Sequence, residues 1–328
     1  MILRRCMRLP RCFVVILASV LLQTHVYAIE PETSGGELLQ RMAEANRQLD
    51  YTGIFTYEHG GTLKTVKVFH AIQDDREVER LVLLSGPKQE ILHRGNDVNC
   101  EHMGNAILRG NAASLATIPE QTLNNYYSVQ IKSDDRVAGR DVAVLHVVPK
   151  DEHRYGYVLG IDKETGLLLQ SLLVGNKNRV LERFQYVDIN IDNTVNAEDL
   201  LASSDSMHVV SPGKSNCLNR GGMPDRQSGA WRAGWLPPGY TMAGLELTQD
   251  NTRETLIYTD GLSVFSLFID SEMPANLPQM QAQRGATVAY LSRVTVDGRH
   301  YTICVVGEIP VETAKLVAQS VSPRQSTP

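Results

Sequence analysis

The pattern of apolar and polar positions changes its period once near the start of the chain. Over residues 35–49, apolar side chains recur at the spacing of an amphipathic helix, with Leu38 and Met42 on the same face. From Tyr51 to Ile191 the period is mostly two, which is typical of strands joined by short turns. The pattern therefore predicts one helix followed by an antiparallel β-meander.

Turn residues indicate where several of the predicted elements end. His59-Gly60-Gly61 separates the first two strands, and Asp134-Asp135 is expected to form a turn between two later strands. Asp260-Gly261 and Asp297-Gly298 predict two-residue hairpin loops. Near the end of the chain, residues 310–320 predict a helix with Pro310 at its first position.

Two segments interrupt the strand pattern. Residues 103–127 combine glycine and proline with scattered apolar side chains, which predicts short helices and loops that cover an open sheet. Residues 193–228 are rich in Asn, Ser, Asp and Gly and predict a linker between domains. A second unit of strands and one helix begins near Trp231. The predicted fold class is therefore α+β, with a large N-terminal antiparallel sheet and a smaller C-terminal α+β domain.

The segment 180–191 has apolar residues on both faces of the predicted strand. A sheet of that kind needs cover on both faces, or it lines a cavity. Core filling and an apolar ligand cavity are both compatible with the pattern, and the sequence leaves the choice open.

The first 28 residues have the pattern of a secretory signal peptide. Several arginines precede a short apolar run, residues 13–22, and Val26-Tyr27-Ala28 has the small residues of a cleavage site. The apolar run is shorter than the roughly 20 residues that a membrane-spanning helix needs. We therefore expect an exported mature chain that begins near Ile29 and does not span a membrane.

Charge and motif content favour a binding protein over an enzyme. The net charge of −5 becomes −9 when four arginines and no acid leave with the signal peptide, so nucleic acid is not an expected partner. The sequence has no nucleophile elbow, zincin motif, P-loop or dinucleotide fingerprint, and its histidines lack metal-ligand spacing. We predict no catalytic residue, metal site or cofactor. His153-Arg154 is interpreted as a pair of strand-end or turn residues at a solvated edge.

Three cysteines remain after cleavage of the predicted signal peptide. Cys304 lies in an apolar strand-like run and is expected to be a buried thiol. Cys100 and Cys217 lie in polar, loop-like contexts. An oxidising compartment permits one disulfide, and if one forms, Cys100 and Cys217 are the pair that we expect.

Five short motifs together resemble the RseB/MucB family, the periplasmic regulators of the envelope-stress sigma factor of Gram-negative bacteria. In the first part of the chain the motifs are Lys150–Tyr157 (KDEHRYGY) and Leu181–Gln185 (LERFQ). In the second part they are Trp235–Gly239 (WLPPG), Tyr258–Leu262 (YTDGL) and Val306–Pro310 (VGEIP). Each motif is weak alone, and their order and spacing carry the resemblance.

The resemblance implies an open β-barrel similar to LolA and LolB for residues 29–192, then the linker 193–228. An anti-sigma-factor-binding domain would follow at residues 229–322, with a tail at 323–328. It also implies a function in the periplasm, where the protein binds the periplasmic part of an RseA/MucA-type anti-sigma factor and shields it from regulated proteolysis. Lipid or lipopolysaccharide would release the partner. A periplasmic lipid or lipoprotein carrier is the alternative function, and homo-oligomer formation stays open.

Two sets of candidate site residues follow from these predictions. A lipid pocket between the sheet and its cover is predicted to be lined by apolar side chains of both: Phe55, Tyr57, Val66, Val68, Leu115 and Tyr126. Partner binding is assigned to aromatic side chains of the second unit, since aromatic residues often anchor interfaces: Trp235, Tyr240, Tyr258 and Phe265. Trp235 and Phe265 also suit core positions.

Overall fold

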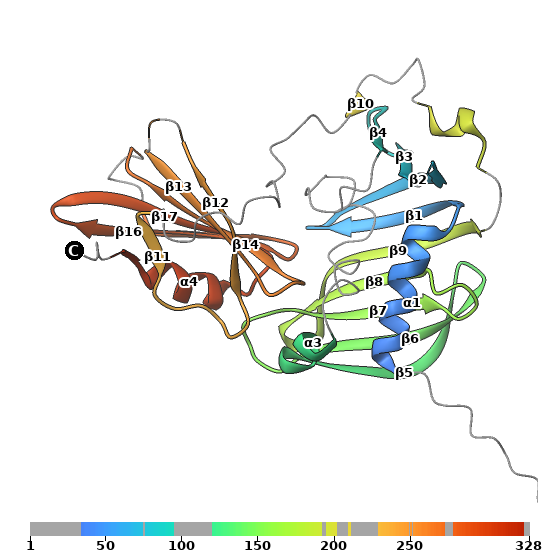
Figure 1. The fold of residues 1–328 in the computed structure, drawn as a ribbon, viewed down its shortest axis with the longest axis horizontal. Coiled ribbons are helices and arrows are strands. Elements are labelled where there is room, and N and C mark those ends of the chain that lie inside the picture. The colour runs from blue at the N-terminus through green and yellow to red at the C-terminus, as the bar shows by residue number, and fades with distance from the viewer. Residues whose placement is uncertain are drawn as a thin grey trace, which may run out of the picture. The chain divides into compact units, whose positions relative to one another are not determined.

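Two sheets of different size organise the part of the chain that the structure describes (Figure 1). The structure is a computed structural model. It describes residues 34–74, 76–94, 120–191, 195–201, 209–210, 229–248, 250, 252–272 and 278–324. All of these residues belong to one structural unit, Ser34–Pro328. The predicted signal peptide, Leu115, Cys100 and Cys217 lie outside the described residues.

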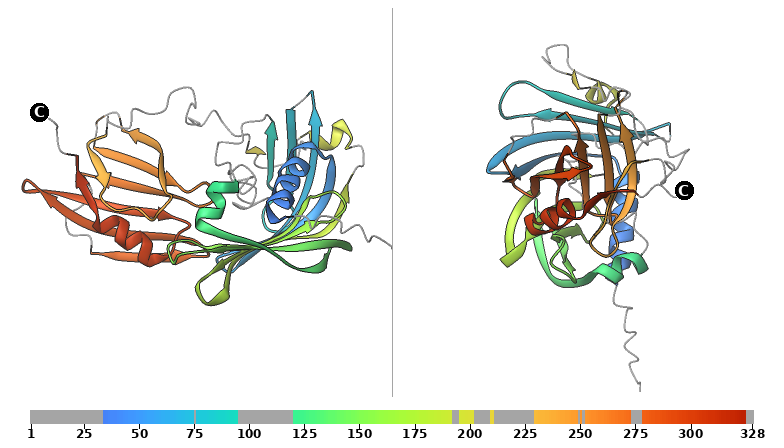
Figure 2. Two further views of the ribbon diagram at one scale, coloured as in Figure 1. Left: turned by 60° about the horizontal axis from the view of Figure 1, so that its bottom comes forward. Right: turned by 90° about the vertical axis from the view of Figure 1, so that its left-hand side faces the viewer.

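The first helix, α1 (Gly35–Gln48), confirms the helix that the apolar spacing predicts. Ser34 begins it with a capping box: the Ser34 hydroxyl accepts from the Glu37 N–H at 3.1 Å, and the Glu37 carboxylate accepts from the Ser34 N–H at 2.8 Å. Leu38 and Met42 lie on its buried face. Figure 1 shows α1 crossing β6–β9, and Figure 2 shows the sheet curving around it.

The larger sheet, here the N-terminal sheet, has ten strands in the order β10-β4-β3-β2-β1-β9-β8-β7-β6-β5. Its strands are β1 (Tyr51–His59), β2 (Thr62–Gln73), β3 (Arg76–Leu83), β4 (Glu90–Arg94), β5 (Tyr127–Val137), β6 (Arg140–Pro149), β7 (Gly156–Asp162), β8 (Leu168–Gly175), β9 (Arg179–Ile191) and β10 (Val209–Val210). All neighbours pair antiparallel except β10 with β4. Within the described residues, no pairing joins β5 to β10, so the predicted open antiparallel sheet is confirmed.

Within the ranges that the structure describes, short helices lie at three connections of the N-terminal sheet. They are α3 (Glu120–Tyr126), which leads directly into β5, η2 (Asn176–Asn178) between β8 and β9, and η3 (Ala197–Leu200) after β9. Among the helices in the described ranges, none has the length and apolar content needed to cross a bilayer.

The prediction of a turn at Asp134-Asp135 is wrong, because β5 continues through both residues. Asp134 pairs with Ala143 and Asp135 with Val142 on β6. The chain turns at Ala138-Gly139 instead, where both residues have positive φ. Residues 130–136 are exposed on this outermost strand, so the carboxylates remain in water although the backbone is extended.

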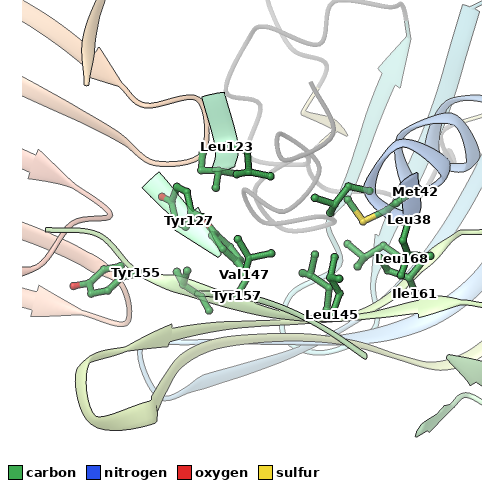
Figure 3. Packing of buried hydrophobic residues seen from close by; sticks show 14 of the residues in the cluster. Leu38, Met42, Leu123, Tyr127, Leu145, Val147, Tyr155, Tyr157, Ile161 and Leu168 are labelled. Atoms are coloured by element: carbon green, nitrogen blue, oxygen red, sulfur yellow. The ribbon is translucent and has the colours of Figure 1, made fainter. Parts of the chain in front are cut away.

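The buried apolar side chains of the N-terminal sheet form two main clusters. The first, here the α1 cluster, joins α1 and α3 to the strands (Figure 3) and includes Leu38, Met42, Leu123, Tyr127, Leu145, Val147, Tyr155, Tyr157, Ile161 and Leu168. The second, here the β1 cluster, includes Phe55, Val66, Val68, Leu81, Phe184 and Tyr186. On β9, Phe184 and Tyr186 are buried whereas Val187 is 60% exposed, so one apolar face of this strand fills core and part of the other is open to solvent.

The smaller sheet, here the C-terminal sheet, has six strands in the order β12-β13-β14-β17-β16-β15. These strands are β12 (Thr241–Leu247), β13 (Arg253–Thr259), β14 (Val264–Asp270), β15 (Met280–Arg284), β16 (Thr287–Val296) and β17 (Arg299–Gly307). Helix α4 (Val311–Gln319) packs on β16 and β17 through its buried Ala314 and Val317 (Figure 2). A two-stranded sheet of β11 (Trp231–Ala233) and β18 (Val321–Pro323) accompanies it. The predicted smaller α+β part of the chain is confirmed.

The two predicted hairpin loops of the C-terminal sheet have different outcomes. Asp297-Gly298 joins β16 to β17 with both residues at positive φ, as a type I′ turn requires, and that prediction is confirmed. The prediction of a two-residue loop at Asp260-Gly261 is wrong, because the four residues 260–263 separate β13 from β14. Asp260 has a different role there: its Oδ1 accepts hydrogen bonds from the N–H groups of Leu262 and Ser263.

Candidate functional site

The residues predicted to line a lipid pocket separate into two groups. Phe55, Val66 and Val68 are fully buried in the β1 cluster, and Tyr57 packs against the same cluster. Tyr126 packs against the α1 cluster instead. The structure therefore brings four of the six residues together, and their role in lipid binding stays a prediction.

The aromatic residues predicted to bind a partner lie in or beside the core of the C-terminal sheet. Tyr240 and Tyr258 each have their ring 5.3 Å from the ring of Phe265, and all three side chains are buried. Trp235 is half-buried, with its ring edge-on to that of His153 at 5.1 Å. Partner binding by these residues stays a prediction, and only Trp235 has appreciable surface in this conformation.

Cys304 lies in the middle of the C-terminal sheet as a free thiol. It faces Phe268 on β14 and Leu291 on β16. The side chain is half-buried rather than fully buried, and this burial raises the pKa of the thiol. A thiol of that kind is a weak nucleophile, because the thiolate is the reactive form.

A buried arginine, Arg154, connects the two sheets, which the prediction of a solvated edge missed. The side chain has no exposed surface. Its Nη1 donates to Asp260 Oδ2 at 2.7 Å, and its Nε and Nη2 reach the two carboxylate oxygens of Asp151 at 3.0 and 2.9 Å. Nη2 also donates to the carbonyl oxygen of Pro238 at 2.5 Å. Asp260 and Pro238 belong to the C-terminal part of the chain, so one guanidinium binds groups of both parts.

Three tyrosine rings surround the same guanidinium. The ring centres of Tyr126, Tyr127 and Tyr240 lie 5.0, 5.5 and 5.2 Å from the guanidinium carbon, within the range of cation–π attraction. The Tyr127 hydroxyl donates to Asp260 Oδ2 at 2.9 Å. Burial raises the pKa of Tyr127, and the Asp260 carboxylate raises it further, so the phenol remains a donor. We call this set, Arg154 with Asp151, Asp260, Pro238 and the three tyrosines, the Arg154 junction.

Four of the sequence motifs meet in this region. The KDEHRYGY motif contributes Asp151 and Arg154, which bind the WLPPG motif at Pro238 and the YTDGL motif at Asp260. The Tyr155 hydroxyl donates to the carbonyl oxygen of Ile309 in the VGEIP motif at 3.0 Å. Residues far apart along the chain therefore form one contact region.

Glu182, in the fifth motif, LERFQ, forms a second connection between the two parts of the chain. Its carboxylate, which is almost fully buried, lies 2.8 Å from His59 Nδ1 and accepts from the Tyr57 hydroxyl at 2.9 Å. From the C-terminal part of the chain, the Ala286 N–H donates to the same carboxylate at 3.3 Å. The Tyr57 hydroxyl has a raised pKa because of its burial and the nearby Glu182 charge.

Two open clefts adjoin these connections. One, of 520 Å³, lies among Glu58, Arg183 and the turn between β15 and β16. The other, of 620 Å³, is lined by His153, Lys177 and the start of α4. Arg179 and Gln283 line both clefts. Because both are open and carry charged side chains, they suit an extended peptide better than an enclosed small molecule.

The fold and this geometry first define the type of architecture: an open sheet and a smaller sheet that are joined by buried polar contacts, with open clefts suited to a peptide. Residues 34–204 match the model of the MucB/RseB N-terminal domain, and residues 225–322 match that of the MucB/RseB C-terminal domain. This chain belongs to the MucB/RseB family, as its motifs predict.

The similarity extends over nearly the whole length of known relatives. The sigma factor AlgU regulatory protein MucB of Pseudomonas aeruginosa is 36% identical over 293 residues, which are 87% of this chain and 90% of that protein. The sigma-E factor regulatory protein RseB of Haemophilus influenzae is 28% identical over 323 residues, covering 96% of this chain and 98% of the relative. A crystal structure of MucB in complex with MucA(peri) matches with a TM-score of 0.72 and 32% identity, over 89% of this chain and 100% of that one.

Proposed function

We propose that this protein is a periplasmic negative regulator of an envelope-stress sigma factor. It binds the periplasmic part of a membrane anti-sigma factor and shields that part from regulated proteolysis. The observation that carries the proposal is the similarity to MucB over both parts of the chain, since a MucB structure contains MucA(peri). The signal-peptide pattern at the start of the sequence supports the periplasmic location.

The partner segment binds in the two open clefts in this proposal. Arg179 is exposed and lines both clefts, so a peptide that passes from one to the other contacts it. Replacing Arg179 with glutamate changes the charge at this position without removing any buried group. Arg293 is also exposed, is not among the residues that line either cleft, and offers the same change as a matched control.

The test is a titration of the mature chain, residues 29–328, with the periplasmic segment of the host's own anti-sigma factor. We expect binding by the wild type, weaker binding by Arg179→Glu and unchanged binding by Arg293→Glu. A wild-type protein that does not bind the segment but retains lipid would contradict the proposal and favour the lipid-carrier function.

Release of the partner by lipid is the second part of the proposal. An acyl chain would enter beside the β1 cluster, and each buried methylene contributes about 0.8 kcal/mol. Six methylenes therefore supply roughly 5 kcal/mol, enough to shift an equilibrium between two states if the lipid binds only one of them. Lipopolysaccharide added to the titration should weaken partner binding, and binding indifferent to lipopolysaccharide would refute this mechanism.

The pocket itself is tested by changing its polarity. Val66 and Val68 have no exposed surface, so aspartate there tests the pocket only if the variant folds. Threonine has nearly the same shape as valine and adds one hydroxyl, so Val66→Thr with Val68→Thr is the milder variant. Val187→Thr, at a 60% exposed position on β9, is the matched control. Lipid binding that is equal in the folded double variant and the control would contradict the pocket assignment.

A further inference from the structure

We propose that Arg154 is a positioning residue that holds the two sheets in one defined arrangement, and that partner binding depends on this arrangement. The partner part of this inference rests on the proposed function. The positioning part rests on the Arg154 junction alone. Arg154 lines neither of the two clefts, so it acts on the partner through the arrangement of the groups that do line them.

The hydrogen bonds of Arg154 require both sheets in a precise arrangement. Asp151 is three residues away and contributes a carboxylate from the same part of the chain. Asp260 and the Pro238 carbonyl come from the other part. A buried charge is stable only when it is paired and hydrogen-bonded, so a small rotation that kept Arg154 and Asp260 buried but separated them would be strongly unfavourable.

The junction therefore favours two distinct arrangements of the two sheets over a continuous range of arrangements. In the docked state the guanidinium has its carboxylates, its carbonyl and its aromatic rings. In a fully separated state water solvates Arg154 and Asp260. Arrangements between these two leave a charge without water and without a partner. Two discrete states are what a ligand needs in order to shift a population, because it must bind the states with different affinity.

Tyr127 links the junction to the interior of the N-terminal sheet. Its ring belongs to the α1 cluster with Leu123 and Met42 (Figure 3), while its hydroxyl donates to Asp260. Any rearrangement that moves α3 or the start of β5 therefore also moves a donor of the junction. The contact between α3 and the C-terminal part is close, because a Cβ at Gly239 would lie 2.5–2.8 Å from ring atoms of Tyr126.

The test compares two arginines that each form a bidentate pair with a carboxylate. Arg154→Met removes the junction charge. Arg140→Met removes the pair with Asp162, where Nε and Nη2 donate at 2.9 and 2.8 Å to a buried carboxylate within the N-terminal sheet alone. Small-angle X-ray scattering of the mature chain measures the arrangement of the sheets, and titration with the anti-sigma-factor segment measures partner binding.

We expect Arg154→Met to broaden the scattering distance distribution and to weaken partner binding about tenfold, within the usual size of coupling between sites. Arg140→Met should leave the scattering profile and the affinity unchanged, although it lowers stability. Equal scattering and equal affinity for the two variants would overturn the proposal. If Arg154→Met does not fold, Asp260→Asn removes the opposite charge while leaving an oxygen to accept from Leu262 and Ser263.

The two proposals fail in different ways. A wild-type chain that does not bind the segment refutes the proposed function, and the scattering comparison still decides whether Arg154 positions the sheets. A wild-type chain that binds, with Arg154→Met binding equally well and scattering identically, refutes only the positioning role.

Discussion

Replacing Met42 with alanine tests whether α1 is held on the N-terminal sheet by burial of its apolar face. The Met42 side chain has no exposed surface and points from α1 into the cluster that contains Ile161 and Leu168 (Figure 3). Truncating a buried methionine to alanine costs about 2–5 kcal/mol, because the lost transfer free energy is added to the cost of a cavity. For a domain of this size, about 3 kcal/mol corresponds to a fall in Tm of about 6–12 °C.

The assay is urea and thermal unfolding of the mature chain, followed by far-UV circular dichroism. Met280→Ala, on the edge strand β15 at 54% exposure, makes the same chemical change on the surface and serves as the control. Surface substitutions usually change stability by less than about 0.5 kcal/mol. If the two variants unfolded at the same midpoint, the packing of α1 on the sheet would be refuted.

Three further predictions concern two polar contacts and one closely packed glycine. Tyr127→Phe removes the hydrogen bond to Asp260, and since a hydrogen bond to a charged group contributes about 1.5–3 kcal/mol, urea unfolding should show a loss of that size. Gly239→Ala should destabilise the fold more than Gly298→Ala in the same assay, because both glycines have positive φ but only Gly239 lacks room for a Cβ. Burial raises the pKa of Asp162, but hydrogen bonds from Arg140 and other groups outweigh it, so its pKa lies below the ordinary value. The carboxylate therefore stabilises the fold above the unfolded-state pKa of about 3.9, and this stabilisation is lost as the pH falls through the folded-state pKa. Asp162→Asn should be less stable at pH 7 and should lose less stability between pH 5 and pH 2, measured by urea midpoints; an unchanged pH dependence would contradict this.

Local patterns in the sequence correctly predicted those elements for which the spacing of apolar residues, or the residue types of a turn, gave a clear signal. The α1 helix follows from the spacing of Leu38 and Met42, and the β16–β17 hairpin follows from Asp297-Gly298. Strand β15 was missed because all of its residues are exposed, so burial imposes no alternation on the sequence Met280–Arg284. A short edge strand of this kind gives no periodic signal.

The Arg154 junction was missed for a different reason. Arg154 and Asp260 are 106 positions apart, and each has an ordinary local interpretation, as a turn residue and as part of a hairpin loop. The available signal was indirect: both residues lie in motifs that carry the family resemblance. In this chain, the motifs that contain Arg154, Pro238 and Asp260 are in direct contact although they lie far apart in the sequence.

The strand β5 has a consequence for association between molecules. Among the described residues it is the last strand of an open sheet, and residues 130–136 are exposed along it. Unpaired strand edges invite another chain to add as a further strand, and charged side chains oppose this. Lys132, Asp134, Asp135 and Arg136 stand on this edge, each with an exposed side chain. The acidic pair that resembled a turn is therefore part of a charged edge, which opposes the addition of a strand from another molecule.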